Sequence, residues 1–213
     1  MSKLPVKRGE ALREHMLHAA KAVFQEMGFE RASMDRIAAH AGTTKRTLYA
    51  HFGRKEDLFL AVFELVLGLQ LHHLGTPADY APDPEQALVL FCARFLQTIL
   101  SSRPLRLFQL AIAETNRFPQ GDTVRLHEAL LESVQALIEQ FLQAHYHLAP
   151  LTAQATAQQL LAQLLYPRFT RALFGAAEPA VTQSTELGSS PAVDLAPIRS
   201  LVAACLPTGT RAA

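Results

Sequence analysis

Basic, hydroxyl and aromatic side chains are concentrated in one short stretch, AAHAGTTKRTLYAHFGRK, from residue 38 to residue 55. Helical spacing predicts a short helix over about 45–52, in which Leu48 and Phe52, four residues apart, face inward. The side chains that this helix exposes are Lys45, Arg46, Thr47, Tyr49 and His51. Cations bind phosphates and polar side chains recognise base edges, so this surface suits the major groove of DNA. A charged, solvated helix of an α-helical bundle would show the same composition.

Two helix starts and one turn must hold this helix in place. Gly42 supplies the positive φ that a sharp turn between helices needs, and Thr44 is placed to cap the helix after the turn. Ser33 is placed to cap an earlier helix over about 34–40, with Asp35 in its first turn, where the helix dipole favours an acid. We therefore expect both capping residues to support the DNA-contacting surface.

Two longer helices flank this pair and share its core. Apolar residues recur at intervals of three and four from residue 10 to residue 27, which predicts a helix that Gly28 ends. A second apolar stripe begins near Lys55 and continues to about residue 73. Because the first three helices have little apolar surface, we expect them to pack against this fourth helix for stability.

The spacing of several residue types in the first 65 residues follows a known pattern without a gap. These residues are Ala20, Phe24, Gly28, Phe29, Ser33, Met34, Asp35, Ile37, Ala38, Ala41, Gly42, Thr47, Leu48, Tyr49, His51, Phe52, Lys55, Glu56, Asp57, Leu58 and Phe59. The stretch resembles the N-terminal DNA-binding domain of the TetR family of transcriptional repressors. The resemblance implies a double-stranded DNA operator, a phosphate contact from Lys55, and a fourth helix through which ligand binding moves the DNA-binding domain. Arg46 departs from the family, which commonly has a small residue such as glycine there, and it is the best candidate for bidentate contact with guanine.

Charge is distributed unevenly along the 213 residues, although the net charge is only +1. Residues 1–56 carry eleven Lys or Arg against six Asp or Glu, and the remainder carries nine against thirteen. A basic first part joined to an acidic remainder is typical of a domain that binds a polyanion attached to one that does not. Residues 1–9 are expected to form a flexible basic arm, and residues 10–56 the helix-turn-helix DNA-binding domain.

Residues 57–213 are expected to form a helical ligand-binding and dimerisation domain. Beyond a proline-rich connector at 75–84, apolar spacing predicts helices over about 84–101, 104–116, 122–147, 152–174 and 195–206, with an exposed loop over 175–194. No segment alternates like a strand, so the fold class is all-α, with about nine helices in a three-helix head and a helical bundle. The stretch at 106–119 also resembles the regulatory domains of AefR-like members of the family.

A pocket for a hydrophobic small-molecule effector is expected between the helices of this second domain. Its predicted lining residues are Phe91, Phe95, Phe108, His127 and Tyr166, with Glu114 and Arg117 as weaker candidates. The three phenylalanines lie on inward stripes, and they would equally serve as core residues. Pro167 should break or kink its helix near Tyr166 because proline lacks the backbone donor and clashes with the preceding turn.

A homodimer is expected through the segments 152–174 and 195–206. Leu160 and Leu164 lie one position apart from Leu161 and Leu165, so the predicted helix is apolar on two sides and requires two partners. A second subunit would supply one of them, and two-fold symmetry would match a palindromic operator.

Other function classes have little support in the sequence. It contains no phosphate-binding glycine loop, no HExxH and no nucleophile elbow, so we expect no enzyme and no cofactor. Cys92 and Cys205 are isolated, which favours reduced thiols in a cytoplasmic protein. No apolar run of about twenty residues predicts a membrane span, and the basic start does not have the pattern of a signal peptide. A regulator without a small-molecule ligand, or a helical metal-binding protein or enzyme, remains an alternative.

Overall fold

The computed structural model describes residues 8–113, 122–177 and 193–207, and these residues form helices without any strand. The chain divides into two compact units. The first unit takes in the described residues up to Gly68 together with those in the range 109–126, and the second unit takes in those in the ranges 69–108 and 127–213. The boundaries fall inside α4 (Lys55–Leu74), α6 (Ser102–Ala113) and α7 (Asp122–Tyr146). The all-α fold class predicted from the sequence is confirmed.

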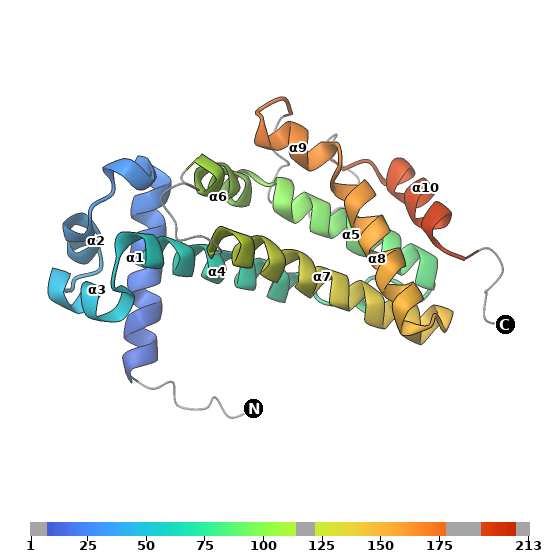
Figure 1. Ribbon diagram of the computed structural model, residues 1–213, viewed down its shortest axis with the longest axis horizontal. Coiled ribbons are helices and arrows are strands. Elements are labelled where there is room, and N and C mark those ends of the chain that lie inside the picture. Colours follow the sequence, from blue (N-terminus) through green and yellow to red (C-terminus); the bar gives the residue numbers. More distant parts are fainter. Residues whose placement is uncertain (1–7, 114–121, 178–192, 208–213) are drawn as a thin grey trace. The chain divides into compact units, whose positions relative to one another are not determined.

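The first unit begins with α1 (Arg8–Arg31), followed by the short helices α2 (Met34–His40) and α3 (Lys45–Phe52) (Figure 1). Gly28, with φ 76° and ψ 172°, interrupts the helical backbone of α1 where the sequence predicted its end. The expected basic arm lies almost wholly in residues 1–7, outside the described ranges. The first unit continues through α4 to Gly68, whereas the sequence placed the domain boundary at residue 56.

Three phenylalanines form the centre of the first unit. Phe24 and Phe29 come from α1 and Phe59 from α4, and each is at most 1% exposed. Their ring centroids lie 5.3–5.8 Å apart, with Phe59 edge-on to both of the others. Such edge-to-face pairs stabilise a core beyond the area that they bury. The packing confirms the expectation that the first helices share their core with the fourth.

Lys55, the first residue of α4, ties that helix to the end of α1. Its Nζ donates hydrogen bonds to the carbonyl oxygens of Phe29 at 2.9 Å and Ala32 at 3.2 Å. The same ammonium lies 4.2 Å from the centroid of the Phe29 ring, within the range of a cation–π interaction. The cation expected to contact a DNA phosphate is thus bound to the protein's own backbone, and its role in the fold has to be separated from any role in DNA binding.

The second unit contains α5 (Pro84–Leu100), α8 (Pro150–Leu165), α9 (Arg168–Leu173) and α10 (Leu195–Cys205), with a 3-10 helix at Pro77–Asp79. Helix α5 is its central element because it packs against α8, α9, α10 and the 3-10 helix (Figure 1). Asp83 caps α5 by accepting a hydrogen bond from the amide of Gln86 at 2.8 Å. The loop expected over 175–194 lies mostly outside the described residues.

The break that Pro167 was expected to cause within the helical segment 152–174 is confirmed. Pro167 separates α8 from α9, as its missing donor and fixed φ require. By contrast, the argument that α8 needs a second subunit to cover its two apolar sides is wrong. Leu160, Leu161 and Leu164 are all at most 5% exposed within one chain, because both α5 and α10 pack against α8.

Helix α4 is long and apolar enough to cross a membrane by length and composition alone, with a mean hydropathy of 1.4 over its best 18-residue window. Half of that window is buried inside the protein. A helix that forms part of a protein core gives the same signal, and Phe59 of α4 is buried in the core against Phe24.

Replacing Lys55 with methionine tests the link between α1 and α4. Lys55→Met keeps the apolar stem but removes a charged donor from two carbonyls, and should lower the free energy of unfolding by about 1–3 kcal/mol. Lys45→Met is the matched control, since it breaks only a solvent-exposed ion pair and should cost much less. Urea unfolding followed by circular dichroism measures both, and equal losses would contradict the bracing role of Lys55.

Candidate DNA-binding surface

Helices α2 and α3 are joined by a tight turn that the backbone hydrogen bonds define. Gly42 has φ 59°, and the amide of Thr43 donates to the carbonyl of Ala38 at 2.9 Å. Nε2 of His15, on α1, lies 3.2 Å from the carbonyl oxygen of Ala41, so α1 holds the turn from outside. The helix–turn–helix arrangement expected from the position of Gly42 is therefore present.

Both predicted caps are formed. Oγ of Ser33 accepts from the amide of Arg36 at 3.2 Å, and Oγ1 of Thr44 accepts from the amide of Thr47 at 3.1 Å. The hydroxyls of Thr44 and Thr47 also lie 2.8 Å apart, and Thr47 is half-buried rather than exposed as predicted. A capping hydroxyl that accepts from an amide retains its own proton, so the Ser33 hydroxyl remains a possible donor to a phosphate.

Helix α3 buries one side and exposes the other as its spacing predicted. Leu48 is fully buried and Phe52 is 6% exposed, and the guanidinium of Arg13 on α1 lies 5.1 Å from the Phe52 ring centroid. The exposed side carries the remaining predicted residues except Thr47, namely Lys45, Arg46, Tyr49 and His51. Tyr49 is 43% exposed, so its ring belongs to the surface rather than the core.

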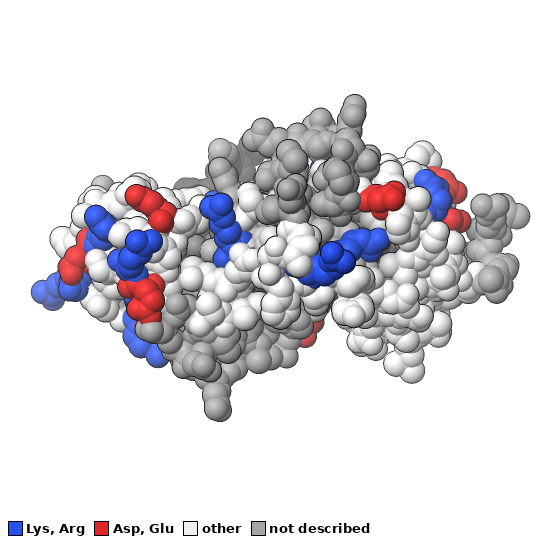
Figure 2. Space-filling view, turned by 90° about the horizontal axis from the view of Figure 1, so that it is seen from above, with Lys and Arg blue, Asp and Glu red and all other residues white. Residues whose placement is uncertain are grey.

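The cations near this surface differ in what already binds them. Lys45 pairs with Asp35 at 2.8 Å, Arg54 pairs with Asp57 at 2.6 Å, and Lys55 is bound to backbone carbonyls. Within the described residues the side chain of Arg46 takes part in no hydrogen bond or ion pair. Figure 2 shows the result, with basic side chains interspersed among acidic ones over the region of α1–α3 at the left of the view. Of the four, Arg46 is the one whose contact with DNA would break no internal interaction.

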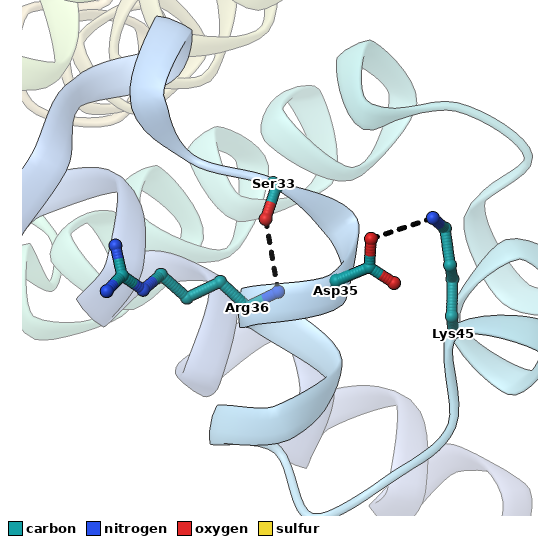
Figure 3. Close-up of polar contacts among 4 residues, drawn as sticks. All are labelled: Ser33, Asp35, Arg36 and Lys45. Atoms are coloured by element: carbon teal, nitrogen blue, oxygen red, sulfur yellow. Dashed lines mark hydrogen bonds and ion pairs between the residues drawn. The ribbon is translucent and has the colours of Figure 1, made fainter.

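The Lys45–Asp35 pair is a feature that sequence reasoning missed (Figure 3). The sequence indicated only that Asp35 interacts favourably with the helix dipole of α2. Its pairing with Lys45 was not predicted because the two residues are ten apart and lie on different helices. The available signal was indirect: an acid in the first turn of one helix and a cation at the first position of the next, across a tight turn. Asp35 raises the pKa of Lys45, first by the hydrogen bond to its carboxylate and then by its charge.

The predicted effector-contacting residues are only partly brought together. Phe91 and Phe95 are buried on α5, at 0% and 1% exposed, and Phe108 packs edge-on against Phe169 with centroids 5.2 Å apart. Tyr166 is 70% exposed, which is incompatible with a place deep in a pocket wall. The side chain of His127, as well as Glu114 and Arg117, lies outside the described residues.

Two further observations concern metals and thiols. In the part of the chain that the structure describes, no three His, Cys, Asp or Glu side chains are grouped to hold a metal ion. Cys92 and Cys205 are free, and burial raises the pKa of Cys92 to about 12, which keeps it a neutral thiol.

Comparison with known proteins agrees with this geometry. Residues 16–62 match the family model for bacterial regulatory proteins of the tetR family, and residues 86–195 match that for the C-terminal domain of AefR-like transcriptional repressors. The chain is 46% identical over 52 residues to the transcriptional activator FasR of Mycolicibacterium smegmatis, covering 24% of each chain. It is 34% identical over 65 residues to the regulator AcrR of Shigella flexneri, covering 30% of each. The matched stretches thus span less than a third of the length of these two relatives.

Solved structures match over nearly the whole chain. A putative TetR-family regulator from Mesorhizobium loti superposes with a TM-score of 0.68 at 24% identity, covering 94% of this chain and 95% of that one. The fatty acid degradation regulator FadR from Bacillus halodurans gives a TM-score of 0.62 at 18% identity, covering 93% and 99%. At these identities the likeness shows the fold, and the two family models, one of which covers more than half of the chain, show the family. The protein belongs to the TetR family of bacterial transcriptional regulators, with a regulatory domain of the AefR-like type.

Proposed function

We propose that the protein is a cytoplasmic, homodimeric transcriptional repressor that binds a palindromic DNA operator and releases or retains it in response to a hydrophobic small molecule. The observation that carries the DNA-binding part is the exposed face of α3, in which Arg46 has no partner among the described residues and stands on a capped helix start. Membership of the TetR family supports the other parts of the proposal, which are the homodimer, the palindromic operator and the response to a small molecule. FasR is described as an activator, so the sign of regulation is a separate question from DNA binding.

In this proposal the residues of the surface have different tasks. Arg46 contacts a base, and its two-pronged guanidinium suits the O6 and N7 acceptors of guanine. Lys45, Tyr49 and the helix starts at Ser33 and Thr44 hold phosphates, while Thr47 and His51 border the groove. Lys55 contributes mainly by fixing the start of α4, and any phosphate contact uses only the hydrogen-bonding capacity that its two carbonyls leave.

Replacing Arg46 tests the base contact. Arg46→Ala should relax the preference at one base pair of each half-site, a loss of roughly 1–3 kcal/mol of discrimination. Lys45→Ala is the adjacent control, and should weaken binding to all sequences alike because a phosphate contact carries no sequence information. Selection of bound duplexes from a randomised pool measures both. An unchanged motif for Arg46→Ala would show that Arg46 contacts only the backbone.

The dimer is proposed through the segments 152–174 and 195–206, although the internal burial of α8 removes the original argument for it. The remaining support is that one chain leaves large apolar side chains exposed at both ends of α8 and at the end of α9, namely Leu151 at 81%, Tyr166 at 70% and Phe174 at 89%. A single α3 also contacts only a few base pairs, and a two-fold pair of subunits doubles the site.

Light scattering after size exclusion tests the dimer. The wild type at micromolar concentration should have twice the chain mass of 23.4 kDa, and the double variant Leu151→Glu/Phe174→Glu should shift toward one chain because it places charge in an apolar interface. Ile112→Glu is the control, since Ile112 is 59% exposed outside these segments. A monomeric wild type that still binds DNA would refute the proposed dimer.

The effector site is proposed in the second unit, with Phe91, Phe95 and Phe108 as apolar contacts and His127 as a polar one. Because Tyr166 is largely exposed, we place it at the edge of this site rather than in its wall. The complete burial of Phe91 and Phe95 equally favours the alternative that this core is sealed and that the regulator has no small-molecule ligand. The ligand screen below distinguishes the two.

A thermal-shift screen of hydrophobic small molecules tests the effector site. Compounds that raise the melting temperature of the wild type should raise that of Phe108→Ala and His127→Ala less, because apolar contact or a polar partner is lost. Leu69→Ala is the control, since Leu69 is 39% exposed in the same unit and lies outside the proposed dimer segments. Hits that stabilise all variants equally would exclude this site, and a screen without hits would favour the ligand-free alternative.

A further inference from the structure

An acidic side chain lies on the DNA-contacting side of the first unit and binds one of its cations. Oδ2 of Asp35 accepts a hydrogen bond from Nζ of Lys45 at 2.8 Å, between the first turn of α2 and the first residue of α3 (Figure 3). Both side chains face solvent, with 51% of the Lys45 side chain and 67% of the Asp35 side chain exposed. A phosphate can therefore reach the ammonium without any rearrangement of the core.

The backbone positions of both partners are fixed. Ser33 caps α2 two residues before Asp35, and Thr44 caps α3 one residue before Lys45. The turn between the helices is closed by the bond from the Thr43 amide to Ala38 and by the contact of His15 with Ala41. The pair therefore forms between two residues whose backbone positions the fold fixes, and this places the Asp35 carboxylate within reach of the Lys45 ammonium.

Lys45 and Arg46 are adjacent, but they differ in the interactions within the protein that DNA binding would disturb. Arg46 can contact DNA without giving up any interaction among the described residues. For Lys45 to bind a phosphate, its ammonium must either leave Asp35 or be shared with it, and in both cases the nearby carboxylate repels the same phosphate. Each effect weakens the Lys45–phosphate contact on any duplex, whatever its sequence.

We propose that Asp35 is a positioning residue that competes with DNA phosphates for the ammonium of Lys45 and so limits the affinity of the protein for every duplex, operator and bulk DNA alike. The inference rests on the proposed DNA-binding function. It identifies an acid within the DNA-binding unit as a regulator of affinity, and leaves base selection to Arg46.

The test compares Asp35→Asn with the wild type on two probes: a duplex recovered by selection from a randomised pool, and a scrambled duplex of the same composition. Asn keeps the shape of Asp but removes the charge, so Asp35→Asn should bind both probes about two- to five-fold more tightly per half-site, as expected for loss of an exposed competing ion pair. The slope of log K against log salt should steepen by up to about 0.9 per half-site, because Lys45 then releases a counterion from a phosphate.

Two controls separate competition for Lys45 from a simple change of net charge. Glu26→Gln removes the same charge from an exposed acid on α1 of the same unit, and should change neither affinity nor salt slope appreciably. In a Lys45→Gln background, Asp35→Asn should lose most of its effect. An equal gain in that background, a gain no larger than that of Glu26→Gln, or weaker binding would each overturn the inference.

Failure of the inference is distinguishable from failure of the proposed function. A wild type that binds no duplex refutes the function, and the inference with it. Wild-type binding to the selected duplex with an unchanged Asp35→Asn variant refutes the inference alone. Asp35→Ser serves as a second variant because serine is tolerated in a first helical turn, and circular dichroism confirms that each variant is folded.

Discussion

The shortness of α3 is the constraint on which the rest of the first unit depends. Isolated helices shorter than about 12–15 residues are marginal in water, and α3 (Lys45–Phe52) has eight residues, only two of which are buried. The helix must therefore be held by its surroundings. Thr44 caps the helix by accepting a hydrogen bond from an unpaired amide of its first turn, and Leu48 and Phe52 are buried on its inner side. Helix α1 contacts α3 through the Arg13 guanidinium and contacts the preceding turn through His15. The outer side chains of α3 are therefore not needed for the packing that holds the helix in place.

The same need explains the contacts at the end of α1. The three-phenylalanine cluster fixes α4 beside α1, and the Lys55 ammonium satisfies two carbonyls where α1 gives way to α2. A cation that neutralises carbonyl dipoles at a helix end is favourable for the same reason as a basic residue in a last helical turn. The compact unit accordingly extends along α4 as far as Gly68, beyond the minimal three-helix motif. A phosphate contact alone would not explain why Lys55 is half-buried.

Features specified by local chemistry were predictable from the sequence, and features specified by long-range packing were not. The caps at Ser33 and Thr44, the turn at Gly42 and the inner side of α3 follow from rules that act within four residues. Most helix bounds in the second unit followed from apolar spacing for the same reason. The burial of Leu161 depends on which helices cover α8, and the exposure of Tyr166 on how the chain leaves α8 before Pro167. Neither can be deduced from periodicity. The pairing of Asp35 with Lys45 joins two helices and required the relative placement of both.

The two neighbouring cations of α3 are assigned different roles because they differ in the protein groups that bind them, not because of their positions in the sequence. Lys45 and Arg46 carry the same charge and are both exposed, yet among the residues that the structure describes a carboxylate lies within hydrogen-bonding distance of the lysine and not of the arginine. A compact ammonium exchanges readily between a carboxylate and a phosphate, since both offer it anionic oxygens and it binds as a point charge without a fixed geometry. A planar guanidinium bound to a base edge makes two directed hydrogen bonds, and for Arg46 the described residues offer no competing carboxylate. In the proposed arrangement affinity and base selection can therefore change independently, because Asp35 acts on Lys45 whereas base contact is assigned to Arg46.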